Sequence, residues 1–100
     1  MPQENSNVKE RSRSDIHSPS RYAVIFHNDD FTPMDFVIAV LVNIFFKDIN
    51  EATSLMLKVH HEGKAIVGTY SYDIAYSKAN IATNIAREQG FPLRITIQKI

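Results

Sequence analysis

The residues best suited to chemistry are a polar cluster, Asn28, Asp29 and Asp30, and a histidine further along the chain, His60. Amide oxygens, carboxylates and imidazole nitrogens accept hydrogen bonds, and carboxylates with a histidine can also form an acid–base set. Asn and Asp are common turn residues, so the cluster alone does not separate a binding site from an ordinary turn. Its meaning depends on the elements around it and on the residues that these elements bring to it.

An enzyme is one class of protein that such groups could serve, with Asp29, Asp30 and His60 as the acid–base set. The sequence has no G-x-S-x-G motif, no phosphate-binding glycine loop and no metal-ligand spacing to support catalysis. It also has no cysteine, which removes thiol nucleophiles, disulfides and thiolate zinc sites. His60 and its neighbour His61 would point to different faces of a helix, so they do not form a metal-binding pair. We therefore predict no enzymatic activity, no cofactor and no metal.

Charge and length exclude further classes of protein. The 100 residues carry 11 basic and 11 acidic side chains, so no net positive field draws the chain to nucleic acid or to an anionic membrane. No apolar run reaches the roughly 18 residues of a membrane span, and the amino terminus has no apolar signal-peptide core. We expect a cytoplasmic protein of one small domain.

The first 20 residues differ in composition from the rest. They contain only three apolar side chains, Met1, Val8 and Ile16, among many Ser, Asn and charged residues. Such a segment buries too little apolar surface to offset the entropy lost on ordering. We predict a flexible tail over residues 1–20, either a solvating extension or a segment that reaches a partner, and a single folded domain over residues 21–100.

The elements that would position the polar cluster follow from hydrophobic periodicity. A β-branched and aromatic run ends just before the cluster, and a helix should begin just after it. Thr32 is the expected N-cap of that helix, with Pro33 in its first position and Asp35 completing a capping box. The full prediction is an α+β fold of three helices on a small, mostly antiparallel three-stranded sheet, in the order βααβαβ. The predicted ranges are 21–26, 33–46, 50–63, 65–70, 72–89 and 93–98.

Two of the predicted helices have notable surfaces. The helix over 33–46 is apolar nearly all round, so either part of it lies open as a binding patch or the next helix and the sheet wrap it tightly. On the helix over 72–89, Lys78 falls inside an apolar arc, where its stem would cover apolar surface. The arc consists of Ile74, Ala75, Ala79, Ile81, Ala82, Ile85 and Ala86.

Collinear blocks of the sequence resemble one known family. The longest is V-I-F-H-N-D-D-F-T-P-M-D-F-V at 24–37, followed by M-L-x-V-H-x-x-G-K-A at 56–65, D-I-A-x-x-K at 73–78 and F-P-L at 91–93. Over residues 21–100 the chain resembles the ClpS family, the adaptors of the bacterial Clp protease. The fold that this resemblance implies has three strands and three helices, in agreement with the order predicted from periodicity.

The resemblance implies an adaptor that captures proteins beginning with Leu, Phe, Tyr or Trp and delivers them to the AAA+ unfoldase ClpA for degradation by ClpP. The implied partners are N-degron peptides, which carry such a first residue, and the amino-terminal domain of ClpA. We expect a monomer, since nothing in the sequence demands a dimer. The family's fold also resembles a domain of the ribosomal stalk protein, so the alternative is a ribosome-associated interaction domain that binds no N-degron. That alternative leaves the cluster of Asn28 and Asp29 without a role.

The resemblance assigns a role in substrate binding to residues of three kinds. Asn28, Asp29 and His60 match the acceptors for the α-amino group of the substrate, a compact cation with three donors. Asp30 and Thr32 match loop and positioning residues. The residues that match the hydrophobic pocket are Met34, Val37, Met56, Val59 and Leu93.

Two further roles follow from the resemblance. Met34 matches the gatekeeper, a side chain that would crowd a β-branched first residue such as Ile or Val. Asp73 and Lys78 match the surface that docks on the unfoldase, although Asp73 replaces the more usual Glu and Tyr76 stands where some members carry another acid.

Overall fold

The computed structural model describes residues 20–100, so the tail predicted for residues 1–20 lies, except for Ser20, outside the described residues. Within this range the predicted order of elements, βααβαβ, is confirmed. The elements are β1 (Tyr22–His27), α1 (Met34–Asn43), α2 (Ile49–Glu62), β2 (Lys64–Tyr70), α3 (Tyr72–Glu88) and β3 (Arg94–Lys99). None of the helices in this range is long and apolar enough to cross a membrane.

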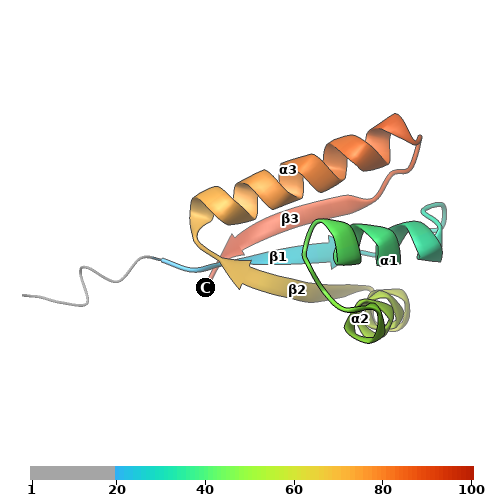
Figure 1. The fold of residues 1–100 in the computed structure, drawn as a ribbon, viewed down its shortest axis with the longest axis horizontal. Coiled ribbons are helices and arrows are strands. Elements are labelled where there is room, and N and C mark those ends of the chain that lie inside the picture. The colour runs from blue at the N-terminus through green and yellow to red at the C-terminus, as the bar shows by residue number, and fades with distance from the viewer. Residues whose placement is uncertain (1–19) are drawn as a thin grey trace, which may run out of the picture.

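β1 is the central strand of the sheet, whose order is β2-β1-β3 with both pairings antiparallel (Figure 1). Its sequence suits this place, because Val24 and Phe26 are fully buried on one face and Ile25 is nearly buried on the other. The pairing with β2 shifts register between Val24 and Ile25, which face Gly68 and Ile66, so that β2 carries one extra residue as a bulge.

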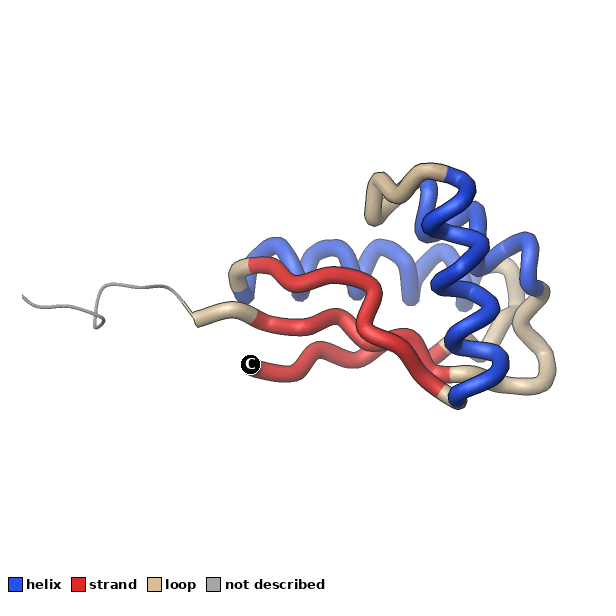
Figure 2. The backbone as a smooth tube through the Cα atoms, turned by 90° about the horizontal axis from the view of Figure 1, so that it is seen from below, coloured by secondary structure: helices blue, strands red, loops and turns tan. Residues whose placement is uncertain are grey.

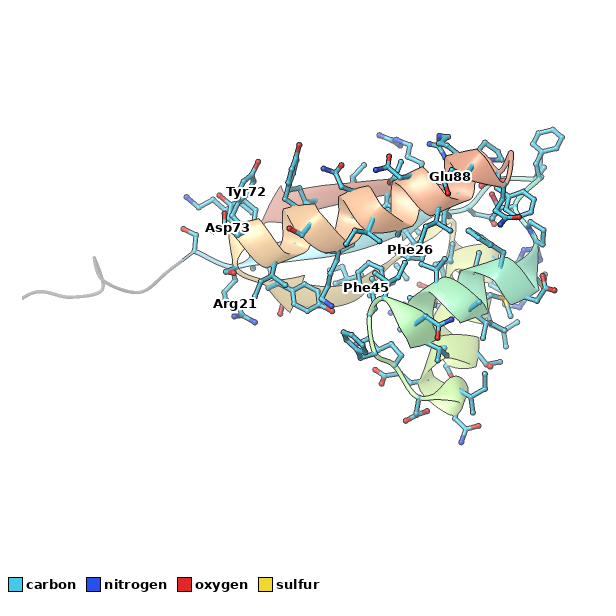
Figure 3. The ribbon with its side chains drawn as sticks, turned by 45° about the horizontal axis from the view of Figure 1, so that its top comes forward. Arg21, Phe26, Phe45, Tyr72, Asp73 and Glu88 are labelled. Atoms are coloured by element: carbon cyan, nitrogen blue, oxygen red, sulfur yellow. The ribbon has the colours of Figure 1, made fainter. Side chains whose placement is uncertain are left out.

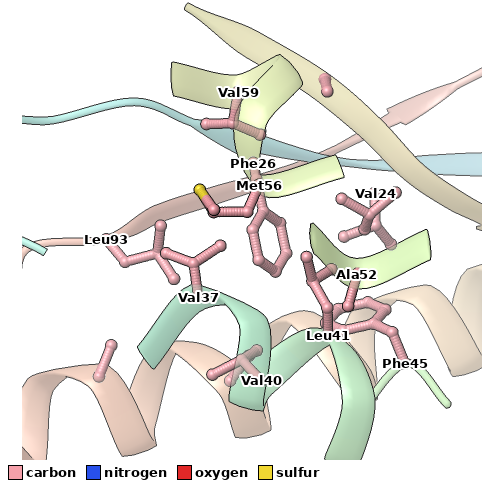
Figure 4. Packing of buried hydrophobic residues seen from close by; sticks show 14 of the residues in the cluster. Val24, Phe26, Val37, Val40, Leu41, Phe45, Ala52, Met56, Val59 and Leu93 are labelled. Atoms are coloured by element: carbon pink, nitrogen blue, oxygen red, sulfur yellow. The ribbon is translucent and has the colours of Figure 1, made fainter. Parts of the chain in front are cut away.

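The helices bury their apolar sides in one core on one face of the sheet. α1 and α3 lie on that face, while α2 stands across the end of the sheet and leads into β2 (Figures 1 and 2). Phe26 of β1 is at the centre, near Met56 of α2 and Leu41 of α1 (Figure 4). Its ring packs edge-on against Phe45, with the ring centroids 5.4 Å apart. The opposite face of the sheet is not covered by any described element (Figure 2).

Both predicted boundaries of α1 are wrong. The helix begins at Met34, and its N-cap is Pro33, which makes no side-chain capping bond. Thr32 does not cap the helix because its hydroxyl donates to the Asp29 carboxylate instead. At the other end the helix stops at Asn43 rather than at Phe46, since Phe46 turns the backbone into the left-handed region, with φ 56°.

The start of α2 was predicted one residue late. The helix begins at Ile49, and the side chain of Asp48 accepts a hydrogen bond of 2.8 Å from the backbone N–H of Glu51. An Asp followed three residues later by a Glu is a capping pattern that is present in the sequence. The prediction of a start at Asn50 overlooked it.

The surfaces of α1 and α3 differ in part from the predictions. Of the two alternatives for α1, the structure shows the open one, because Met34 is 46% exposed whereas Val37 on its inner side is 7% exposed. For α3 the predicted arc is too wide, since Ile74 and Ile81 are 49% and 51% exposed. The buried side of α3 consists of the small side chains Ala75, Ala82 and Ala86.

The end of α2 gives a first testable prediction. Gly63 ends the helix at φ 91°, and a Cβ added there would meet no atom within 4 Å. Gly63→Ala should therefore destabilise the fold by about 1–2 kcal/mol through backbone strain alone. The free energy of unfolding from urea titration measures this cost.

A matched control separates backbone strain from the mere addition of a side chain. Asn tolerates the left-handed region better than Ala, so Gly63→Asn should cost clearly less than Gly63→Ala. Equal stability of the Ala variant and the original chain would contradict the account of this turn.

Candidate functional site

The loop between β1 and α1 is built around the carboxylate of Asp29. Its Oδ1 accepts the backbone N–H groups of Phe31 and Thr32, at 2.8 and 2.7 Å. Its Oδ2 accepts the hydroxyl of Thr32 at 2.8 Å. Thr32 thus donates to both carboxylate oxygens, through its backbone N–H and its hydroxyl, and this fixes the plane of the carboxylate. A carboxylate has about four lone-pair sites, so Oδ2 can still accept a further donor.

These bonds also set the ionisation of Asp29. Partial burial alone would raise the pKa of its carboxyl, but the hydrogen bonds from Thr32 and Phe31 outweigh it. Together with the more distant positive charge of Arg87, they hold the pKa below its usual value. Asp29 is therefore a carboxylate at neutral pH, and it offers a fixed negative charge to a cation.

A backbone contact brings this loop to the end of α2. The N–H of Asn28 donates to the carbonyl of Gly63 at 2.8 Å. Gly63 directly follows the last turn of α2, which carries Val59 and His60. The side chains of Asn28 and His60 are exposed and make no hydrogen bond with another described residue. Their acceptor groups are thus available to a ligand.

A cavity of about 210 Å³ lies between the loop, α1 and α2. Polar groups and apolar walls meet in it, because the loop and the end of α2 supply acceptors while Val37, Met56 and Val59 are nearly buried in the core. Met34 is 46% exposed and stands at its rim. The lining residues are Asn28, Asp29, Asp30, Thr32, Met34, Val37, Met56, Val59 and His60.

All nine lining residues are among those singled out from the sequence. Of the predicted pocket residues, only Leu93 is not in the lining. It is 1% exposed and belongs to the core, beside Val37 (Figure 4). The alternation expected from position 93 onward begins one residue later in β3, and Leu93 belongs to the segment that leads into that strand.

The two predicted docking residues lie away from this cavity. Asp73 is exposed in the first turn of α3, near Tyr72 and Arg21 and at the other end of the molecule from α1 and α2 (Figure 3). Lys78 follows more than one turn later, and its Nζ donates to the carbonyl of Ile44 at 2.8 Å.

Lys78 contacts aromatic rings as well as that carbonyl. Its Nζ lies 4.5 Å from the ring centroid of Phe46 and 5.5 Å from that of Tyr70. The expected covering of apolar surface is therefore accompanied by a specific bond at the carboxyl end of α1, where a cation is favourable. The residue spacing gave no signal of this contact, because Ile44 is 34 positions away.

The cavity has a defined chemical preference. Acceptors at one end and apolar walls at the other suit a small amphiphilic cation, one with several N–H donors beside a large apolar group. A metal ion is less well suited, because no group of three or more metal-ligating side chains exists among residues 20–100.

Comparison with known proteins gives a consistent result. The family model of the ATP-dependent Clp protease adaptor protein ClpS matches residues 17–96. The ClpS adapter of Vibrio atlanticus is 47% identical over 95 residues, which are 95% of this chain and 90% of the relative. The ClpS adapter of Desulforapulum autotrophicum is 40% identical over 97 residues, covering 93% of each chain.

A solved structure has the same fold. Agrobacterium tumefaciens ClpS2, bound to L-phenylalaninamide, is similar with a TM-score of 0.81 and 37% sequence identity. The match covers 83% of this chain and 100% of that one.

The bonds to Asp29 give a second prediction. Thr32→Val keeps the size of the side chain and removes the hydroxyl that donates to Oδ2. Because this bond favours the charged form, its loss should raise the pKa of Asp29, as followed by a carboxyl-carbon NMR titration. Thr32→Ser retains the hydroxyl and serves as the control.

Loss of the Thr32 hydroxyl should also alter how the free energy of unfolding depends on pH. Since the pKa of Asp29 is lower in the folded chain, its charged form stabilises the fold at neutral pH, and this contribution is lost as pH falls through the folded pKa. The Val variant should lose less stability over that acid range than the Ser variant. An unchanged Asp29 pKa in the Val variant would refute the role of the hydroxyl.

Proposed function

The chain belongs to the ClpS family of ATP-dependent Clp protease adaptors, and from this premise we propose that it recognises N-degrons. In this proposal the cavity binds the free α-amino group and the large apolar first side chain of a substrate, namely Leu, Phe, Tyr or Trp. The adaptor then delivers the substrate to the amino-terminal domain of the unfoldase ClpA, for degradation by ClpP. The function is binding and transfer, so we expect no enzymatic activity.

The observation that carries the proposal is the meeting of acceptors and apolar walls in one cavity. An α-ammonium has three N–H donors, and Asn28, Asp29 and His60 offer an amide oxygen, a carboxylate and an imidazole nitrogen around it. Asp29 is held in place before any ligand arrives, so little ordering is needed on binding. Thr32 acts as a positioning residue through its hydroxyl, and Asp30 adds negative charge at the rim.

The apolar part of the cavity suits one large side chain. Val37, Met56 and Val59 are the nearly buried walls, and burial of one such side chain contributes roughly 1.5–3 kcal/mol. Each hydrogen bond to the ammonium adds about 1.5–3 kcal/mol. After the cost of association, the affinity should be on the order of micromolar, which suits a protein that must release its cargo. Leu93 supports this wall from within the core.

Support also comes from the ligand of the similar ClpS2 structure. L-phenylalaninamide combines a free α-amino group with an aromatic side chain. These are the two features that the cavity of this chain can accommodate. Membership in the adaptor family also favours this function over a ribosome-associated domain, which would leave the acceptors at Asn28 and His60 unused.

Delivery would use surfaces apart from the cavity. Asp73 is exposed at the start of α3, so a partner can reach it while a substrate occupies the cavity. Lys78 is partly buried and already donates a hydrogen bond to the carbonyl of Ile44. To dock on the unfoldase, its ammonium would have to contact the partner with a second N–H group or exchange the bond to Ile44 for one to the partner. We further propose that residues 1–20 are the segment that acts on the unfoldase and that the compartment is the cytoplasm.

The test of this function is a binding titration with a Leu-initiated peptide and the same peptide acetylated at its amino group. Acetylation removes the charge and two of the three donors, so affinity should fall by at least about 100-fold, the lower end of the loss expected for two charged hydrogen bonds. Isothermal titration or fluorescence anisotropy measures both affinities. A second arm uses Asp29→Asn, which removes the charge but keeps an acceptor for the loop N–H groups, and it too should weaken binding.

Two outcomes of such titrations would contradict the proposal. Equal affinity for the free and acetylated peptides would show that the α-amino group is not the recognised feature. Binding of Gly-initiated peptides as tightly as Leu-initiated ones would show that the apolar walls are not used.

The exposed rim residue gives a fourth prediction. Met34→Ala should allow Ile- and Val-initiated peptides to bind about tenfold more tightly, because the crowding of a β-branched side chain is relieved. Affinity for Leu-initiated peptides should change much less. Met34→Leu is the matched control, since it keeps the bulk at the rim, and unchanged discrimination in the Ala variant would rule out a gatekeeper at this position.

A further inference from the structure

The uncovered face of the sheet has a distinct chemical character. The register of the strands places two cations on this face, Lys64 of β2 and Arg94 of β3, on either side of His27 of β1. A hydrogen bond of 2.8 Å between its ring and the hydroxyl of Thr96 orients His27. Its pKa is lowered, chiefly by burial and further by the positive charges of Arg94 and Lys64. His27 is therefore uncharged at neutral pH, and the positive potential of this region comes from Lys64 and Arg94.

Two more cations extend this region. Lys58 projects from α2 to the side of the face, and Arg21 lies at its far end, where its guanidinium donates to the carbonyl of Thr69 at 2.8 Å. None of these lysines and arginines forms an ion pair with another described residue. These cations can therefore pair with acidic groups of a ligand.

The centre of the face is apolar and hollowed. Ile66 is 55% exposed, and Ile25 forms the floor beside it. A shallow cavity of about 340 Å³ opens there, and none of its lining residues carries a carboxylate. The lining residues are Ile25, Lys58, Lys64, Ala65, Ile66 and Gln98.

We propose that this face, defined by Lys58, Lys64, Ile25, Ile66 and Arg94, is a docking surface for an acidic protein segment that carries an apolar side chain. The cationic rim would pair with Asp or Glu side chains, and the hollow over Ile25 and Ile66 would take one Leu-sized group. The surface shares no lining residue with the cavity between α1 and α2, so both can be occupied together.

Other occupants fit this face less well. A second copy of the chain would bring the same cations against one another, and like charges facing each other are unfavourable. A nucleic acid would use the cations for its phosphates, but the register places no Phe, Tyr or Trp on this face for bases to stack on, and His27 is held by its bond to Thr96. An acidic segment of a protein satisfies both the charges and the apolar centre.

The probe for this surface is the peptide acetyl-Glu-Leu-Asp-Glu-Leu-Glu-amide, whose blocked amino group prevents recognition as an N-degron. Titrated into the full chain labelled with ¹⁵N, it should shift the backbone signals of Ile25, Ile66 and Lys64 and leave those of Asp29 and Val59 unchanged. The shifts should weaken as NaCl is raised. The same peptide with Gln in place of its acidic residues is the control and should produce no shifts at this face.

Variants test the cations directly. The double variant Lys58→Glu and Lys64→Glu should bind the acidic probe at least about tenfold more weakly, the sum expected for two exposed charges. Lys99→Glu makes a charge change outside the cavity lining and should retain most of the affinity. The dispersion of the ¹⁵N signals verifies that all variants are folded, which keeps this test independent of N-degron recognition.

Three outcomes would overturn the proposal. The first is the absence of shifts at Ile25 and Ile66 with the acidic probe. The second is an equal response to the Gln peptide, which would leave no role for charge. The third is displacement of the acidic probe by a single-stranded oligonucleotide or by anionic phosphatidylserine vesicles at lower concentration than the probe itself, which would assign the face to another class of partner.

Discussion

The loop between β1 and α1 depends on the bonds that one carboxylate makes. Asp29 accepts two backbone N–H groups and one hydroxyl from the residues that follow it, and these bonds give the segment its shape without help from a helix cap. Each bond favours the ionised carboxylate, so the interactions that order the loop also keep the charge in place. A cation that enters the cavity therefore meets a carboxylate that is already oriented. The entropy of ordering this side chain and its loop is lost on folding and does not weaken binding.

The rest of the fold brings the other lining residues of the cavity to Asp29. A bond from Asn28 to Gly63 joins the loop to the end of α2, and this brings His60 to the same cavity. The core positions Val37 and Met56 below it, so that the apolar walls are part of the packing that stabilises the domain (Figure 4). The uncovered face of the sheet is the electrostatic opposite of this site, with cations around an apolar centre. A chain with no net charge thus carries two surfaces suited to ligands of opposite charge.

The order of the elements could be predicted from the sequence because periodicity places the strands and helices. Nearly the whole cavity could be predicted too, but only through the resemblance to the ClpS family that the N-D-D block and the later blocks carry. The role of Thr32 could not, since a Thr before Pro at a helix start has the same pattern whether it caps the helix or bonds to Asp29. Leu93 belongs to the predicted pocket through the resemblance alone, and the sequence does not fix its strand register, in which a shift of one residue changes which face a side chain takes. The bond from Lys78 to Ile44 joins two elements distant in sequence, and no local pattern encodes it.

The central claim is that an orienting carboxylate, fixed in advance, receives the α-amino group of a substrate. A crystal structure of the chain with a Phe-initiated dipeptide amide tests it most directly. We predict the ammonium within hydrogen-bond distance of Asp29 Oδ2, Asn28 and His60, with Oδ1 still accepting from Phe31 and Thr32 and the phenyl ring between Val37 and Met56. A ligand bound with its amino group turned to solvent, or an Asp29 that has released the loop to reach it, would contradict the account.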